Sequence, residues 1–259
     1  MAEFKIKRYD FGLIIYDVLF SRRVKIIKVI NHSGSNLFKG KVIFPEEIEE
    51  KPVFLIKENA FKDFFCDELV LPSGIILSNR AFAASEIRRI HIPSMMSIPD
   101  ECFEDSWLEE LTDSSSVLFI GEGAFAGTTN LKCFRWLKKV SRIPSNCFRN
   151  SGIRKIEGIQ DVNTIQRSAF EGSKLEEIVL TGSVFIGPKC FASTPLKCIR
   201  SLNGGGALEL SSSAISGCGD VDVSDFEIVY LRKTGSSNSK IKLKTGIDTV
   251  VIDNEDCLK

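Results

Sequence analysis

Hydrophobic and polar positions repeat along most of this chain with a period of about 22 residues. A small residue followed by phenylalanine, either Ala-Phe or Cys-Phe, recurs seven times in register, with steps between successive Phe residues of 21, 21, 22, 23, 22 and 21. Self-similarity of this kind predicts a solenoid, in which each unit buries its apolar face only against its neighbours. We therefore expect one column of stacked structural anchors, formed by Phe61, Phe82, Phe103, Phe125, Phe148, Phe170 and Phe191.

The residues inside one unit predict a strand. Ile90-His91-Ile92 alternates with a period of two, so the isoleucines are expected to point inward and the residue between them outward. Polar and glycine-containing segments such as residues 127–130 follow the Phe and predict turns. Each unit is thus expected to hold one strand, a turn and a short extended or helical return.

The spacing of the apolar positions resembles a known repeat. One copy reads Val162-x-x-Ile165-x-x-x-Ala169-Phe170, followed by Leu175-x-x-Ile178-x-Leu180. In this pattern the chain resembles the BspA-type leucine-rich repeat family over residues 42–202. The resemblance implies a β-rich solenoid: a leucine-rich repeat with a parallel concave sheet, about seven to eight repeats and a cap at each end.

The segments on either side of the repeats are predicted to be caps. Residues 1–41 resemble the amino-terminal cap of that family, which would shield the first core layer. After Leu202 the pattern decays, with Ala214-Ile215 as a degenerate eighth copy. Residues 203–259 are therefore predicted to contain this degenerate repeat and a carboxy-terminal β cap, with a separate small domain as the alternative.

Charge and composition exclude several classes of protein. Lys+Arg and Asp+Glu balance at 34 each, so no overall field attracts nucleic acid. No apolar run approaches the roughly 18 residues of a membrane-spanning helix, so no membrane insertion is expected. The first ten residues are charged and do not resemble a secretion signal. Clustered Cys and His ligands are missing, so neither a metal nor a cofactor is expected.

The eight cysteines are expected to be free thiols. Cys102, Cys147 and Cys190 occupy the small position before Phe, and Cys66 an apolar strand position, so these four are predicted to lie in the core. Cys133 and the seventh-repeat cysteine, Cys198, are predicted to point outward, about 14 Å apart and too far for a disulfide. Free thiols favour a reducing compartment.

Equivalent residues of successive strands are expected to form two outward columns on the sheet. The first column is Glu68, Arg89, Glu110, Cys133, Lys155, Glu177 and Cys198, and the second is Val70, His91, Thr112, Arg135, Glu157, Val179 and Arg200. The alternating charges allow two interpretations: a solvated ladder that neutralises itself, or a face that docks a protein or glycan. In the second, the binding residues are Arg89, His91, Glu110, Arg135, Lys155, Glu157, Glu177 and Arg200.

The resemblance implies non-catalytic protein–protein recognition, as in adhesins at microbial cell surfaces. The chain would then be a monomer that binds a protein or glycoprotein on its concave face. An intracellular leucine-rich repeat scaffold or effector is the alternative, favoured by the missing secretion signal and the unpaired cysteines, so surface and cytoplasmic locations both stay open. A third hypothesis is an enzyme with its site in the carboxy-terminal cap, where Asp220, Asp222 and Asp225 cluster. His32 lies in a polar loop, and His91 has no neighbouring nucleophile stronger than Thr112, so no catalytic residue is expected.

Overall fold

The computed structural model describes residues 4–20, 22–31, 40–94, 97–112, 114–135, 140–159, 161–232, 242–246 and 250–254. The chain forms two compact units, Met1–Leu131 (unit 1) and Lys132–Lys259 (unit 2). Strands are the regular elements of both units, and the helical segment found in the described residues is the 3-10 turn η1 (Ser114–Ser116). The predicted β-rich class is confirmed.

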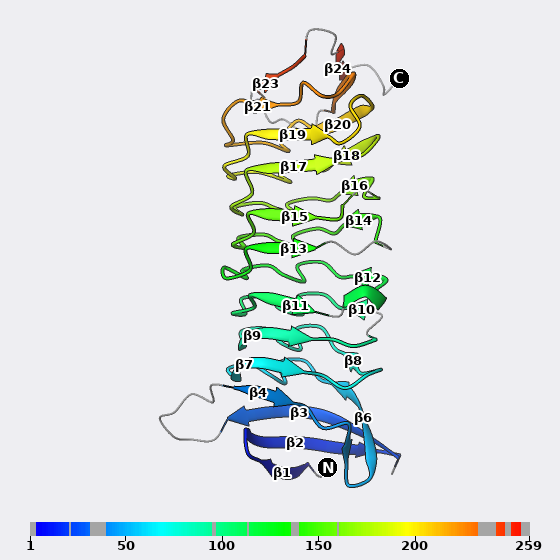
Figure 1. Ribbon diagram of the computed structural model, residues 1–259, viewed down its shortest axis with the longest axis vertical. Helices are drawn as coiled ribbons and strands as arrows, with labels where there is room; N and C mark the ends of the chain where they lie inside the picture. Colours follow the sequence, from blue (N-terminus) through cyan, green and yellow to red (C-terminus); the bar gives the residue numbers. More distant parts are fainter. Residues whose placement is uncertain are drawn as a thin grey trace. The chain divides into compact units, whose positions relative to one another are not determined.

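Unit 1 begins with antiparallel strands and continues as parallel ones. The strands β1, β2 and β3 pair antiparallel, and β3 then pairs in parallel with β6, which also pairs with β5 and β8. We call these six strands the second sheet of unit 1: β1 (Lys5–Tyr9), β2 (Gly12–Leu19), β3 (Arg23–Asn31), β5 (Glu47–Ile48), β6 (Lys51–Ile56) and β8 (Ile76–Leu77). A separate ladder on the same side as β8 joins β10 (Ser97–Ile98) and β12 (Phe119–Ile120) (Figure 1). The first sheet contains the parallel strands β4 (Lys41–Ile43), β7 (Phe65–Val70), β9 (Glu86–His91) and β11 (Glu110–Thr112).

Unit 2 is built in the same way from parallel strands. We call two separate ladders together its first sheet. One joins β13 (Cys133–Arg135) and β15 (Lys155–Glu157), and the other joins β17 (Glu177–Leu180), β19 (Cys198–Ser201), β21 (Val221–Asp222) and β23 (Leu243–Lys244). Its second sheet contains β14 (Arg142–Ile143), β16 (Thr164–Ile165), β18 (Val184–Ile186), β20 (Ala207–Ser211), β22 (Ile228–Arg232) and β24 (Val250–Asn254).

Each turn of the solenoid contributes a strand to both sheets. In unit 1 the strands β7, β9 and β11 lie above one another on one side, with β8, β10 and β12 on the other (Figure 1). The sequence analysis expected one strand per unit and an extended or helical return. The return is in fact a short strand in a second parallel sheet, because its backbone pairs with the equivalent segment of the next turn, as β16 does with β18.

The predicted Phe column forms the centre of the core. Its seven members are fully buried. In unit 1 the rings of Phe82 and Phe103 stack with centroids 5.4 Å apart. In unit 2 Phe170 stacks on both Phe148 and Phe191, again at 5.4 Å. The near-parallel rings are spaced by the distance between neighbouring turns, so the regular sequence period produces the stack.

The small residue before each Phe fixes the backbone register between turns. The Phe82 amide donates to the Cys102 carbonyl at 2.9 Å, and the equivalent bond recurs within each unit, at Phe61 and Phe103 in unit 1 and at Phe148 and Phe170 in unit 2. The last bond of the series runs from the Phe191 amide to the Ala214 carbonyl at 2.7 Å, which places Ala214 at the small position of an eighth turn. The domain boundaries at residues 41/42 and 202/203 stay predictions.

Two positions in each turn adopt a left-handed backbone. They lie two residues before and two residues after the Phe. Around Phe82 they are Arg80 (φ 59°) and Ala84 (φ 53°), and the equivalent position before Phe191 is Lys189 (φ 55°). Glycine and asparagine adopt this conformation with less strain than other residues. Asparagine is therefore a conservative replacement for the backbone at such a position.

Candidate functional site

The predicted outward columns are present on the first sheet of each unit. In unit 1, Glu68, Arg89 and Glu110 are in register on adjacent strands, as are Val70, His91 and Thr112. In unit 2 the paired positions are Cys133 with Lys155, Arg135 with Glu157, Glu177 with Cys198, and Val179 with Arg200. We call these outward surfaces the first-sheet face of each unit.

The structure groups the eight candidate binding residues in three places. Arg89, His91 and Glu110 lie together on β9 and β11 of unit 1. In unit 2, Arg135, Lys155 and Glu157 lie on β13 and β15. Glu177 and Arg200 lie on β17 and β19.

Ion pairs between neighbouring residues neutralise much of the first-sheet face. Lys41 Nζ lies 2.6 Å from the Glu68 carboxylate, and its hydrogen bond lowers the pKa of Glu68. Lys155 Nζ lies 2.5 Å from the Glu157 carboxylate and likewise lowers the pKa of that group. These charges are largely solvated, so the pairs contribute little to folding stability. Their effect is to set which charges a partner would meet.

Arg135 and Arg200 are both on the first-sheet face of unit 2, but they differ in exposure and in the number of neighbouring carboxylates. The Arg135 side chain is 83% exposed and approaches the Glu157 carboxylate at 3.5 Å. Arg200 lies between two carboxylates, Glu177 and Asp225, each at 3.7 Å. A bound carboxylate could form bidentate hydrogen bonds with either guanidinium. Arg135 is the more accessible of the two.

The side chains of His91 and Thr112 meet across neighbouring strands. The Nδ1 atom of His91 lies 2.8 Å from the Thr112 hydroxyl oxygen, as the predicted register requires. The hydrogen bond fixes the orientation of a ring that is half-buried on the face. The other histidine, His32, lies outside the described residues.

The cysteine predictions hold for the core positions and fail at one outward position. Cys66, Cys102, Cys147 and Cys190 are buried, and Cys133 is exposed. Cys198 was predicted to be exposed but is 8% exposed. The strand β21 pairs with β19 and places Asp222 beside Cys198 on the sheet. Burial raises the pKa of Cys198, so its thiol stays protonated at neutral pH.

Thiol labelling should distinguish these positions. In the native protein we expect iodoacetamide to modify Cys133 first, while Cys102, Cys147 and Cys190 react only on unfolding. Burial raises the pKa of these three thiols and blocks access to them. Peptide mass mapping over a time course measures each rate, and denaturant provides the control in which all eight cysteines react. Labelling of Cys102 as fast as Cys133 would contradict the core assignment.

The three aspartates of the carboxy-terminal segment do not converge. The Asp222 carboxylate accepts a hydrogen bond from the Ser224 amide at 2.9 Å and lies 4.0 Å from Lys244 Nζ. Asp225 faces Arg200, and Asp220 is exposed to solvent. Within the described part of the chain, no group of three or more His, Cys, Asp or Glu residues is placed to hold a metal ion.

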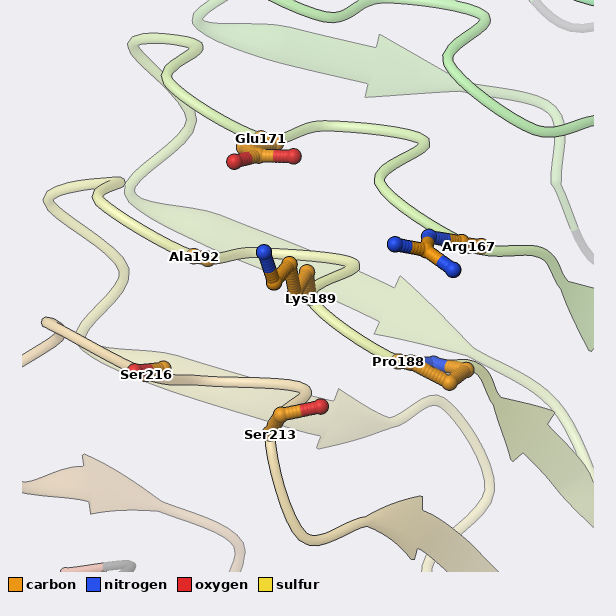
Figure 2. Close-up of a pocket in the computed structure, with 7 residues that line it drawn as sticks. All are labelled: Arg167, Glu171, Pro188, Lys189, Ala192, Ser213 and Ser216. Carbon is orange, nitrogen blue, oxygen red and sulfur yellow. The ribbon is translucent and has the colours of Figure 1, made fainter. Parts of the chain in front are cut away.

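One surface feature of unit 2 was not predicted. A depression of about 460 Å³ opens beyond the ends of β16, β18 and β20 (Figure 2). Its walls are formed by Arg167, Glu171, Pro188, Lys189, Ala192, Ser213 and Ser216. A comparison of equivalent positions in successive repeats would have shown that its serines stand where another repeat has acidic residues.

The comparisons with known proteins agree with this architecture. The profile described as BspA type leucine rich repeat region matches the chain in six copies, over residues 20–108 and 96–220. No curated protein sequence matches the chain. Among the described residues, no helix is long and apolar enough to cross a membrane.

Two solved structures share the fold. A leucine rich cell surface protein from Faecalibacterium prausnitzii A2-165 has a TM-score of 0.55 at 16% identity, covering 88% of this chain and 70% of that chain. The pneumococcal vaccine antigen PcpA has a TM-score of 0.51 at 14% identity, covering 94% of this chain and 70% of that chain. At these identities the likeness concerns the fold alone.

Proposed function

Because this chain belongs to the BspA-type leucine-rich repeat family, we propose that it is a non-catalytic recognition module that binds a protein partner on its first-sheet face. The proposal extends to an adhesin-like role at a cell surface. The description of the Faecalibacterium prausnitzii protein as a cell surface protein supports that extension.

The observation that carries the proposal is the register of the outward columns. Charged side chains from consecutive strands lie side by side, for example Glu110 opposite Arg89 in unit 1 and Glu157 opposite Arg135 in unit 2. Such a rigid array offers several contacts at fixed spacing, which reduces the entropy lost on binding. Arginine is enriched among the residues that dominate protein interfaces, so Arg135 and Arg200 are the expected main contacts.

A double substitution tests the face. We expect Arg135→Ala with Arg200→Ala to weaken partner binding at least about tenfold, which corresponds to about 1.4 kcal/mol. The matched control is Arg142→Ala with Arg149→Ala, which removes two exposed arginines of unit 2 that lie outside the first sheet. Biolayer interferometry against a panel of purified extracellular matrix glycoproteins gives the affinities. Equal affinities for the two double variants would reject the first-sheet face as the site.

An intracellular scaffold is the second candidate, and the buried free thiols favour it. Cys66, Cys102, Cys147 and Cys190 are unpaired in the core, a pattern typical of proteins that fold in a reducing compartment. Labelling intact cells with a membrane-impermeant amine-reactive biotin separates the two candidates. Recovery of the biotinylated protein from intact cells supports the adhesin, and labelling only after lysis supports the scaffold.

A further inference from the structure

We call the surface formed by the exposed residues that flank the core Phe of each turn the turn face, for example Lys62 in unit 1 and Lys189 and Ser216 in unit 2. In unit 1 this face shows how the fold neutralises a cation two residues before a core Phe. Arg80 holds that position before Phe82. Its guanidinium pairs with Glu101 at 2.5 Å and with Glu104, both from the next turn. Relative to Phe103, these acids stand two residues before and one residue after. The two carboxylates saturate Arg80 and leave it no charge to offer a ligand.

Unit 2 repeats this arrangement with the acids replaced. Lys189 stands two residues before Phe191, and the next turn is aligned by the hydrogen bond from the Phe191 amide to Ala214. The two positions that hold Glu101 and Glu104 in unit 1 are here occupied by Ser213 and Ser216. The turn that would supply two carboxylates to this lysine therefore supplies two hydroxyl groups, both of which can donate to an anion.

These residues line the depression described above. Figure 2 shows Arg167 and Glu171 on one turn, Pro188, Lys189 and Ala192 on the next, and Ser213 and Ser216 on the third. Among the described residues, no ion pair joins Arg167 or Lys189 to a carboxylate. Two cations and one carboxylate leave the depression with an excess positive charge.

We propose that this depression is a binding site for a carboxylate-bearing saccharide, a uronate. The sugar carboxylate takes the place that Glu101 and Glu104 have at Arg80, between Lys189 and the hydroxyls of Ser213 and Ser216. Arg167 donates to further sugar oxygens, and Glu171 accepts from sugar hydroxyls.

The size and the remaining lining suit a sugar. Pro188 is half-buried and presents apolar surface that can contact the C–H face of a pyranose ring, and the buried Ala192 lies beneath it in the lining. A volume of about 460 Å³ is within the range of small-molecule sites and admits a mono- or disaccharide. The site is open and its cations are exposed, so binding is weak and falls as salt is added.

This site is independent of the proposed protein-binding function. It lies on the turn face, and it shares no residue with the first-sheet face. Loss of one site leaves the other intact, so failure of either proposal can be recognised separately.

The test is a titration of the whole chain with galacturonate, followed by amide chemical shifts. We expect saturable shifts at Lys189 and Ser213 with a dissociation constant on the order of 1 mM, from the efficiency per atom typical of small ligands. Lys189→Asn removes the cation and suits the left-handed backbone at φ 55°. Ser213→Glu with Ser216→Glu restores the acid pair of unit 1. Both changes are expected to weaken binding at least about tenfold.

The control variant is Lys62→Glu. It lowers the net charge by the same two units as the double serine variant, at an exposed position on the turn face of unit 1, and it should bind galacturonate as the unmodified chain does. The proposal is overturned if no saturable shift occurs or if Lys189→Asn binds equally well. Acetate binding as tightly as galacturonate, or galactose binding equally well, would overturn the assignment to an acidic sugar.

Discussion

Replacing Phe170 with alanine is expected to lower the free energy of unfolding of unit 2 by about 3–5 kcal/mol. The ring is fully buried and stacks between Phe148 and Phe191, at 5.4 Å from each. Its removal loses the transfer free energy of a large aromatic side chain and leaves a cavity between two neighbouring turns. Because a solenoid turn contacts only its neighbours, the loss is concentrated in unit 2 and the contacts inside unit 1 are unchanged.

Urea unfolding followed by far-ultraviolet circular dichroism measures this effect. We expect Phe170→Ala to lower the midpoint, or to split the transition as unit 2 unfolds at lower urea concentration than unit 1. Phe185→Ala is the matched control in the same unit, since that ring is half-buried on β18 and the Arg232 guanidinium lies over it, 5.6 Å from the ring centroid. Its cost is expected to be about 1 kcal/mol. Equal shifts for the two variants would be incompatible with a stacked Phe core.

The core was predictable because one residue type marks it in every turn. The spacing of the Phe residues places equivalent atoms at one position per turn, and the stacked rings follow from that alone. The outward columns followed from the same argument, since alternation around Ile90 fixes which neighbours, such as Arg89 and His91, face solvent. The register of Arg89 with Glu110 is therefore a direct consequence of the repeat length.

The second-sheet strands inside the repeats were missed because they carry too little signal. Strands such as β16 are two residues long, and a pair such as Thr164-Ile165 cannot show alternation. The burial of Cys198 was missed for a different reason. The neighbouring strand β21 lies where the repeat pattern has decayed, so the pairing of Cys198 with Asp222 is a long-range contact without a local sequence signal.

The depression in unit 2 could have been found by comparing columns instead of single motifs. The strand columns, where signs alternate, carry no sign of the depression, because its residues lie at the turn positions around each Phe. There the informative signal is a difference between repeats: Ser213 and Ser216 stand where Glu101 and Glu104 pair with Arg80. Such differences can be detected in a repeat fold, because the other turns show which residue types are usual at each position.

Gly121→Ala is expected to destabilise unit 1 by about 3 kcal/mol or more. A Cβ atom at Gly121 would lie 2.4 Å from the Asp100 amide nitrogen and 2.6 Å from the Pro99 carbonyl carbon. Both are backbone atoms, and the two turns are joined beside them by the hydrogen bond from the Gly121 amide to the Ile98 carbonyl at 2.8 Å. No side-chain rotation can relieve the contact, so the two turns must separate and weaken these bonds.

Gly187→Ala is the comparison variant for this prediction, because the added Cβ atom would have a less severe contact with the backbone. Gly187 also lies four residues before a core Phe, but a Cβ atom there would meet its nearest neighbour, the Arg167 amide nitrogen, at 3.0 Å. A shift of a few tenths of an ångström accommodates it, so we expect a cost of about 1 kcal/mol. Urea midpoints of the two variants give the order, and hydrogen exchange at Gly121 and Glu122 shows whether the turns part locally. If Gly121→Ala is as stable as Gly187→Ala or more stable, the prediction is wrong, and the backbones at Gly121 and Asp100 have room for a methyl group.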